Sequence, residues 1–366
     1  LSISCLTSAM FRLFRHKIFV SAVRQLCGTE QDLSHEGITL YYQVMKAIIL
    51  AGGHATRLWP ITKNRAKPLL PLGDQPIIDY IVQDIKNEVD EIIISTNEKF
   101  ADDFDNYIAD KGLQKTVRVV VEDQDSEDEK TGTIGAIIKL LVKENIRDDL
   151  IVIGGDNYQS FDGAEFVEFC REKEAPANVV YDVNDEDFAT QFGVVDVDDE
   201  KIVDFEEKPE EPPSTLASIA WYFFPKDQLS LFGDYEDHFA ETDIPADQYL
   251  DEPGRLNEWA HKQTDMYAFS FDGEWFDVGT PEGYLQATAS VTDGKIINGD
   301  TSSSDIGENV VIMEGAEVKN STVENSIIFP EAHVKDSNVK NSILDQHAKI
   351  DDVDLNDALI GEHTDI

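Results

Sequence analysis

Residues 291–366 carry an apolar repeat of 16 residues, and this period restricts the possible folds more than any other feature of the chain. Within one repeat the apolar steps are six, five and five residues. A run of hairpins would not keep so constant a period, whereas three short strands per coil, each with one inward aliphatic side chain, make a β-helix. We therefore predict a parallel β-helix here. Its three columns are Ile296, Ile312, Ile328, Leu344 and Ile360; Val318, Val334, Ile350 and Ile366; and Val323, Val339 and Leu355.

Residues 45–290 alternate short apolar runs with amphipathic segments. The runs at 46–50, 91–96, 117–121 and 150–153 have the length and aliphatic content of buried strands. The segment 76–85 places its apolar residues on one helical face, and helices are also predicted from 132 and from 281 to about 290. Strands that alternate with helices indicate an α/β fold with a mixed, mostly parallel sheet covered by helices. Aromatic and β-branched runs at 178–181, 221–224 and 267–271 extend this sheet.

The first predicted strand leads into a loop that holds Gly52, Gly53 and Arg57, and Lys67 follows ten residues later. Glycines allow backbone N–H groups to approach a phosphate closely, and an arginine supplies a planar cationic fork. In so acidic a chain, two cations beside a glycine loop indicate a bound polyanion; the alternative is an ordinary turn with solvated charges. Ligands of such sheets bind beyond the carboxyl ends of the strands, so Asp156, after the strand at 150–153, is expected at the same edge.

The formal net charge is −43, and its distribution separates possible explanations. Residues 45–290 hold 54 acidic and 21 basic side chains, and residues 291–366 hold 16 and 5. A nucleic-acid mimic or an acidic tail would concentrate the charge, whereas adaptation to high salt would spread it. Because the charge is spread, we expect a halophilic protein in a salt-rich cytoplasm, where a Debye length of about 3 Å at 1 M salt screens self-repulsion. We predict no nucleic-acid partner.

Residues 1–44 differ from the rest, with four basic and three acidic side chains. Met45 stands directly before the first predicted strand, so we expect residues 1–44 to be translated upstream sequence or a dispensable extension. A signal peptide is the alternative, but Arg12, Arg15 and Lys17 interrupt any apolar region. Outside this segment only Cys170 is left, which excludes a disulfide framework. No apolar run approaches the roughly 20 residues of a membrane span, and no membrane partner is predicted.

Five sequence blocks in order resemble the sugar-1-phosphate nucleotidyltransferase family. The family loop G-G-x-G-T-R-L-x-P and its following K-P-x-x-P match residues 52–60 and 67–71, with Ala55 in place of the third glycine. The resemblance covers nearly all of residues 45–366 and implies a Rossmann-like nucleotidyltransferase domain at 45–290 and a left-handed β-helix at 291–366. The other matching blocks are residues 132–136, 155–157, 207–209 and 275–280.

The resemblance implies that a sugar 1-phosphate attacks the α-phosphorus of a nucleoside triphosphate (NTP) and that pyrophosphate leaves. It also implies a magnesium ion, Mg²⁺, on the aspartates that match Asp156 and Asp277. Arg57 and Lys67 are the implied catalytic residues. Nucleotide binding is implied for Gly52, Gly53, Thr56 and Gly132, and binding of the sugar phosphate for Gly193, Glu207 and Lys208.

Several alternatives stay open. Glucose 1-phosphate with dTTP or UTP is the first choice of substrates, and mannose 1-phosphate with GTP is the second. Ala55 also suggests a catalytically weak regulatory homologue that binds a nucleotide sugar. An oxidoreductase is disfavoured because the loop lacks G-x-G-x-x-G. An acyltransferase would need a histidine between coils, and His333, His347 and His363 are candidates, although surface positions in a tail used for homo-oligomer contact or allostery fit them better.

Overall fold

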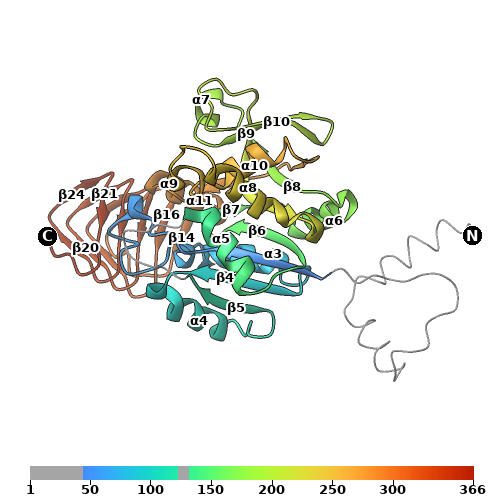
Figure 1. The fold of residues 1–366 in the computed structure, drawn as a ribbon. Coiled ribbons are helices and arrows are strands. Elements are labelled where there is room, and N and C mark those ends of the chain that lie inside the picture. The colour runs from blue at the N-terminus through green and yellow to red at the C-terminus, as the bar shows by residue number, and fades with distance from the viewer. Residues whose placement is uncertain (1–43, 123–131) are drawn as a thin grey trace, which may run out of the picture. The chain divides into compact units, whose positions relative to one another are not determined.

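The computed structural model describes residues 44–122 and 132–366 (Figure 1). The expected N-terminal extension covers residues 1–44, and residues 1–43 of it lie outside the described part of the chain. Within the described part, no helix is long and apolar enough to cross a membrane.

A mixed sheet organises the first part of the structure, and nine strands of the described residues form it. The strands β5, β4, β1 and β6 are parallel neighbours, as predicted, and β8 and β12 are also parallel. Antiparallel pairs surround β11 and β10. In spatial order the strands are β5 (Val117–Val121), β4 (Glu91–Thr96), β1 (Met45–Leu50), β6 (Asp149–Gly154), β11 (Leu216–Phe224), β8 (Ala177–Asp182), β12 (Tyr267–Ser270), β10 (Lys201–Glu207) and β9 (Gly193–Asp198).

Helices cover both faces of this sheet because successive strand residues point to opposite sides. Ile49 of β1 belongs to a buried cluster with residues of α3, α4 and α6, whereas its neighbour Ile48 belongs to a cluster with residues of α5, α8 and α10. The helices are α3 (Ile77–Ile85), α4 (Ala101–Asp110), α5 (Gly132–Lys143), α6 (Gly163–Lys173), α7 (Glu186–Ala189), α8 (Ser230–Ala240), α9 (Ala246–Tyr249), α10 (Pro253–Ala260) and α11 (Pro281–Val291).

Short elements lie near the ends of the sheet strands. They are the 3₁₀ turns η1 (Thr56–Leu58), η2 (Lys67–Leu69), η3 (Glu98–Phe100) and η4 (Lys226–Gln228), the hairpin of β2 (Pro71–Leu72) with β3 (Gln75–Pro76), and the antiparallel pair β7 (Asn157–Gln159) with β13 (Trp275–Asp277).

The predicted β-helix is confirmed. Its described residues form three parallel sheets, and neighbouring coils pair at a spacing of 16 residues, as in Ile312 with Ile328 and Val318 with Val334. The sheets are β14 (Lys295–Ile297), β16 (Val310–Ile312), β19 (Ser326–Ile328), β22 (Ile343–Leu344) and β25 (Leu359–Ile360); β15 (Asp305–Ile306), β18 (Thr322–Glu324), β21 (Asn338–Lys340) and β24 (Asp354–Asn356); and β17 (Glu317–Lys319), β20 (His333–Lys335) and β23 (Lys349–Asp351).

One position of the predicted columns is wrong. Ile296 pairs with Val311, fifteen residues on, so it does not share the register of Ile312. The reason is that two apolar columns run along this sheet. The inward column contains Ile312, and the outward column contains Val311, with which Ile296 packs.

The side chains of the outward column are buried against residues that precede the β-helix. We call this contact the joint cluster. It brings together the segment after the glycine loop, helix α11 and one face of the β-helix. Its fully buried members are Leu58, Ile61, Leu70, Leu72, Ile77, Val278, Tyr284, Leu285, Ala287, Val311, Ile327, Phe329 and Ile343.

Candidate active site

The glycine loop follows β1 at the carboxyl edge of the parallel strands, as predicted. Strand β4 and the residue after it hold the start of the loop: Ala51 N–H donates to the Ser95 carbonyl at 2.7 Å, and Asn97 Nδ2 donates to the Gly52 carbonyl at 3.0 Å. A Cβ added to Gly53 would meet no atom of the described residues within 4 Å, so residues 44–122 and 132–366 leave this face of the loop open. Such an open backbone can approach a ligand closely.

Ala55 has φ 46° and ψ 47°, in the left-handed region. Its carbonyl accepts a hydrogen bond of 2.8 Å from Thr62 Oγ1, which ties the turn to the following segment. This conformation explains why a glycine suits the position, because an L-residue there carries a steric cost.

A carboxylate that the sequence analysis did not select lies against the loop. A Cβ added to Gly52 would be 2.4 Å from Glu122 Oε1, so the glycine allows this carboxylate to lie against the loop. Ser95 Oγ donates to Glu122 Oε1 at 2.9 Å, and burial raises the pKa of Glu122. Glu122 directly follows β5. Its place after an apolar strand, like that of Asp156, was the sequence signal that could have identified it.

Lys67, Asp156 and Asp277 come together as predicted for a common site. Lys67 Nζ lies 2.8 Å from Asp156 Oδ2 and 3.8 Å from Asp277 Oδ1. The Lys67 side chain is 8% exposed, but the two carboxylates are 42% and 38% exposed, so the carboxylates border solvent while the amine is buried behind them. Pairing of β7 with β13 sets Asn157 opposite Asp277, which brings the two aspartates to one edge.

The two carboxylates differ in proton affinity. Burial raises the pKa of Asp156, but the ammonium of Lys67 and its hydrogen bond outweigh burial and hold this pKa below its usual value. Burial also raises the pKa of Asp277; there the more distant Lys67 does not compensate, and the charge of Asp156 raises the pKa further. Charges at different distances therefore separate two chemically identical groups.

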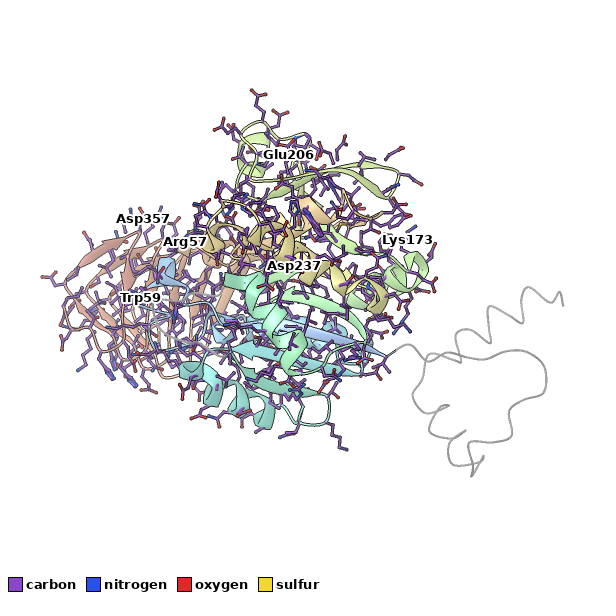
Figure 2. All side chains as sticks on the ribbon, in the orientation of Figure 1. Arg57, Trp59, Lys173, Glu206, Asp237 and Asp357 are labelled. Atoms are coloured by element: carbon purple, nitrogen blue, oxygen red, sulfur yellow. The ribbon has the colours of Figure 1, made fainter. Side chains whose placement is uncertain are left out.

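Arg57, labelled in Figure 2, is exposed and belongs to η1, directly after the glycine loop. Its charge acts on Asp277, where it lowers the pKa against the effect of burial. Arg57, Lys67, Asp156 and Asp277 thus form one electrostatic group beside the glycine loop.

Two partly exposed carboxylates at a sheet edge suit magnesium. Mg²⁺ is typically bound through one or two carboxylates together with waters and substrate phosphates. Asp156 and Asp277 provide this donor set, and the Lys67 ammonium contacts both carboxylates, which shows that their field accommodates a cation. The residues present therefore fit the metal that the resemblance implies.

A second group surrounds Glu207. Its Oε2 would be 2.8 Å from a Cβ on Gly193 and 1.6 Å from a Cβ on Gly254, so two glycines make room for the carboxyl group. Burial, with the negative charge of Glu252, raises the pKa of Glu207 to about 7. Gly193 and Glu207 are thus neighbours as predicted, whereas Gly254 at the start of α10 was missed; its only sequence signal is the proline before it.

The predicted phosphate ligand Lys208 has a partner in this structure. Its ammonium pairs with Glu252, and Arg255 Nε lies 2.9 Å from Glu252 Oε2. One carboxylate thus pairs with two cations. Lys208 and Arg255 can contact an incoming phosphate only if Glu252 releases them.

Contacts on two sides connect the group of Lys67, Asp156 and Asp277 with the group around Glu207. Trp275 Nε1 donates to Asn157 Oδ1 at 2.9 Å, and its ring meets Phe192, the neighbour of Gly193, at a centroid distance of 5.0 Å. At the other side, Gly132 packs on the backbone of Leu250, in the segment that leads into α10. The predicted nucleotide and sugar residues therefore belong to one continuous framework.

The three candidate histidines, His333, His347 and His363, lie in the coils of the β-helix. The rings of His347 and His363 stack in parallel at 4.9 Å between centroids, and the side chain of His363 is 70% exposed. His333 contacts Glu317 at 3.5 Å.

Residues 46–294 match a protein family described as nucleotidyl transferase. A Sulfolobus acidocaldarius protein provisionally named a mannose-1-phosphate guanyltransferase is 26% identical over 76% of each chain. A glucose-1-phosphate adenylyltransferase of Clostridium novyi is 31% identical over 69% of this chain and 68% of its own. Among solved structures, a provisionally named glucose-1-phosphate thymidylyltransferase of Bacillus anthracis, in complex with sucrose, is 29% identical with a TM-score of 0.57 and covers 69% of this chain and 97% of its own.

Proposed function

The chain belongs to the sugar-1-phosphate nucleotidyltransferase family, and from this premise we propose that it joins glucose 1-phosphate to the nucleotidyl group of dTTP or UTP. The observation that carries the proposal is the contact of the Lys67 ammonium with Asp156 and Asp277 beside the open glycine loop. The choice of sugar and nucleotide is supported by the similarity to the thymidylyltransferase structure.

In the proposed reaction, a phosphate oxygen of the sugar 1-phosphate forms a bond to the α-phosphorus of the NTP. The bond between the α-phosphorus and the oxygen that bridges it to the β-phosphorus breaks, and pyrophosphate leaves with the electron pair. The protein has little covalent work in such a transfer; it holds two anions in line and stabilises the charge that develops. A buried lysine fixed at the α-phosphate, as proposed for Lys67, acts without reorganisation during the reaction.

The other residues divide the remaining tasks. We assign the triphosphate to the backbone of Gly52, Gly53 and Thr56, and the leaving pyrophosphate to Arg57. Asp156 and Asp277 would hold Mg²⁺, which supplies charge neutralisation between the two phosphate groups when bound. Gly132 would pack beside the base. Gly193 and Glu207 would bind sugar hydroxyls, and Lys208 the sugar phosphate once Glu252 releases it.

The test is pyrophosphate release by the variants Lys67→Ala and Asp277→Asn, in multimolar KCl with Mg²⁺. Loss of a preorganised contact to transition-state charge typically lowers kcat by about 10²–10³, and we expect this range for Lys67→Ala. Lys63→Ala and Asp272→Asn are matched controls, because both side chains are exposed and neither is assigned to the site. Near-wild-type turnover in both site variants would refute the assignment.

A second pair of substrates, mannose 1-phosphate with GTP, is favoured by Glu122. Guanine presents two adjacent N–H donors, N1–H and N2–H₂, and a carboxylate offers two acceptor oxygens. Uracil and thymine present one such donor between two carbonyl oxygens, which a carboxylate would repel. Glu122 lies against Gly52, the first glycine of the loop, so its carboxylate borders the proposed nucleotide site.

A panel of NTPs against glucose and mannose 1-phosphates distinguishes the two pairs, and Glu122→Gln tests the reason. Since a bidentate contact discriminates between bases by about 1–3 kcal/mol, the change should shift the ratio of kcat/KM from GTP toward UTP by about fivefold or more. An unchanged ratio would show that Glu122 does not read the base.

A further inference from the structure

The β-helix contacts the segment of residues 57–71, which carries Arg57 and Lys67. Arg65 Nη1 lies 3.3 Å from Asp345 Oδ1, and the Arg65 guanidinium lies 5.1 Å from the ring centroid of Phe329. Asp345 follows β22 and Phe329 follows β19, so both partners belong to adjacent coils. The Asp345 side chain is 5% exposed and that of Arg65 is 24% exposed, so the carboxylate end of this ion pair is desolvated.

Further contacts fix the same segment on both sides of Arg65. A Cβ added to Gly361 would lie 2.9 Å from Pro60 Cγ, so the last coils approach the segment closely. Toward its other end, Tyr284 of α11 donates a hydrogen bond of 2.5 Å to the Pro71 carbonyl. Leu58 and Ile61 are buried in the joint cluster. The segment is therefore clamped at several points by groups outside the sheet.

Arg65 stands two residues before Lys67. Two residues of extended chain span at most about 7 Å, and the residue between them, Ala66, is 1% exposed in well-packed surroundings. A displacement of Arg65 is therefore passed on to Lys67 with little loss. The Lys67 amine lies 2.8 Å from Asp156 and 3.8 Å from Asp277, and such a displacement would change both distances.

We propose that Asp345 of the β-helix is a positioning residue of the active site, which acts through Arg65 to hold Lys67 against the two aspartates. Its catalytic consequence rests on the proposed function of Lys67. A buried carboxylate that pairs with a guanidinium is strongly directional, so loss of the Asp345 charge takes from Arg65 the partner that orients it. The β-helix is thereby part of the catalytic geometry and not only an appended repeat.

Turnover kinetics of Asp345→Asn give the first test. A misplacement of about 1 Å can cost up to 10²-fold in rate, and we expect kcat to fall by about tenfold or more while both KM values change less than threefold. In a Lys67→Ala background the same change should have no further effect on kcat, because the group that it positions is gone. An equal fold-loss in both backgrounds would mean general loosening of the enzyme and would overturn the proposal.

Glu324→Gln is the matched control. It removes the carboxylate of an exposed ion pair between adjacent coils, with Lys340 at 3.1 Å, which does not involve the segment. Wild-type kcat is expected for it. A loss like that of Asp345→Asn would again indicate a general effect of the β-helix and would overturn the proposal. Should Asp345→Asn fail to fold, Arg65→Lys serves instead, since it keeps the charge but loses the planar contact with Phe329.

A second measurement does not depend on turnover. Lys67 is 7% exposed, whereas Lys340 has an exposed side chain. The rate at which an amine-acylating reagent modifies Lys67, relative to Lys340 in the same sample, can be followed by mass spectrometry. Asp345→Asn should increase this ratio several-fold, and an unchanged ratio would overturn the positioning role. An inactive wild-type enzyme would instead refute the proposed function, and the labelling ratio would still decide the positioning role.

Discussion

The left-handed conformation of Ala55 leads to a prediction about stability. Such a conformation costs an L-residue about 1–2 kcal/mol, and Ala55→Gly removes this cost. Against it stand about 0.4–1 kcal/mol for the greater freedom of glycine in the unfolded chain and about 0.3 kcal/mol for a half-buried methyl group. The free energy of unfolding should therefore rise by about 0.5 kcal/mol, although an alanine-to-glycine change normally lowers it.

Ala66→Gly in the same segment is the matched control. Ala66 has φ −63° and is 1% exposed, so glycine there relieves no strain and removes a buried methyl group. This variant should lose about 1.5 kcal/mol from the sum of the entropic and burial terms. Urea unfolding in multimolar KCl, followed by circular dichroism, measures both. The expected difference between the variants is about 2 kcal/mol, and equal destabilisation of both would refute the reasoning from the backbone conformation.

Three other outcomes are expected. Tyr107→Phe removes the 2.8 Å hydrogen bond to buried Asp79 and should lower the free energy of unfolding by about 1–2 kcal/mol in urea. Because the pKa of Glu207 is raised from 4.5 to about 7, its contribution to stability is present below pH 4.5 and is lost as the pH rises through about 7; Glu207→Gln should flatten this part of a pH–stability curve. Dialysis into dilute buffer should abolish the circular dichroism of the folded state, since the charge of −43 is then unscreened; an unchanged spectrum would contradict the halophilic interpretation.

Much of the fold could be predicted because its signals are local. The aliphatic runs of β1 and β4 and the apolar face of α3 indicate their structure without reference to the rest of the chain, and their observed bounds lie within two residues of the predicted ones. The antiparallel strands around β11 were harder to order. Their pairing depends on which strands meet in space, as for β11 with β6 and β8, and no periodicity within one strand carries that information.

The site residues could be predicted where a chemically suitable side chain stands next to a recognisable sequence motif. Lys67, Asp156 and Asp277 stand next to conspicuous motifs, and the structure brings them together. Glu122 was not selected although it follows an apolar strand, because it also begins a strongly charged loop in which that signal is easily overlooked. Glu252 was missed for a different reason: it pairs with Lys208, which is 44 residues away in the chain, and a pair between distant segments cannot be read from composition.

The packing of the β-helix against the segment that carries Arg57 and Lys67 nevertheless left a trace in the sequence. Residues on one strand alternate between two faces, so a β-helix strand with two adjacent aliphatic residues must bury its outward side as well. Val311, Ile327, Ile343 and Leu359 recur every 16 residues, each directly before an inward residue, and they pack in the joint cluster. The other two sheets of the β-helix lack such a second column, because polar residues flank Val323 and Val339 in one of them and Val318 and Val334 in the other. One apolar outer face out of three predicts a docked β-helix, and the segment docked against it is the one that delivers Lys67 to the site.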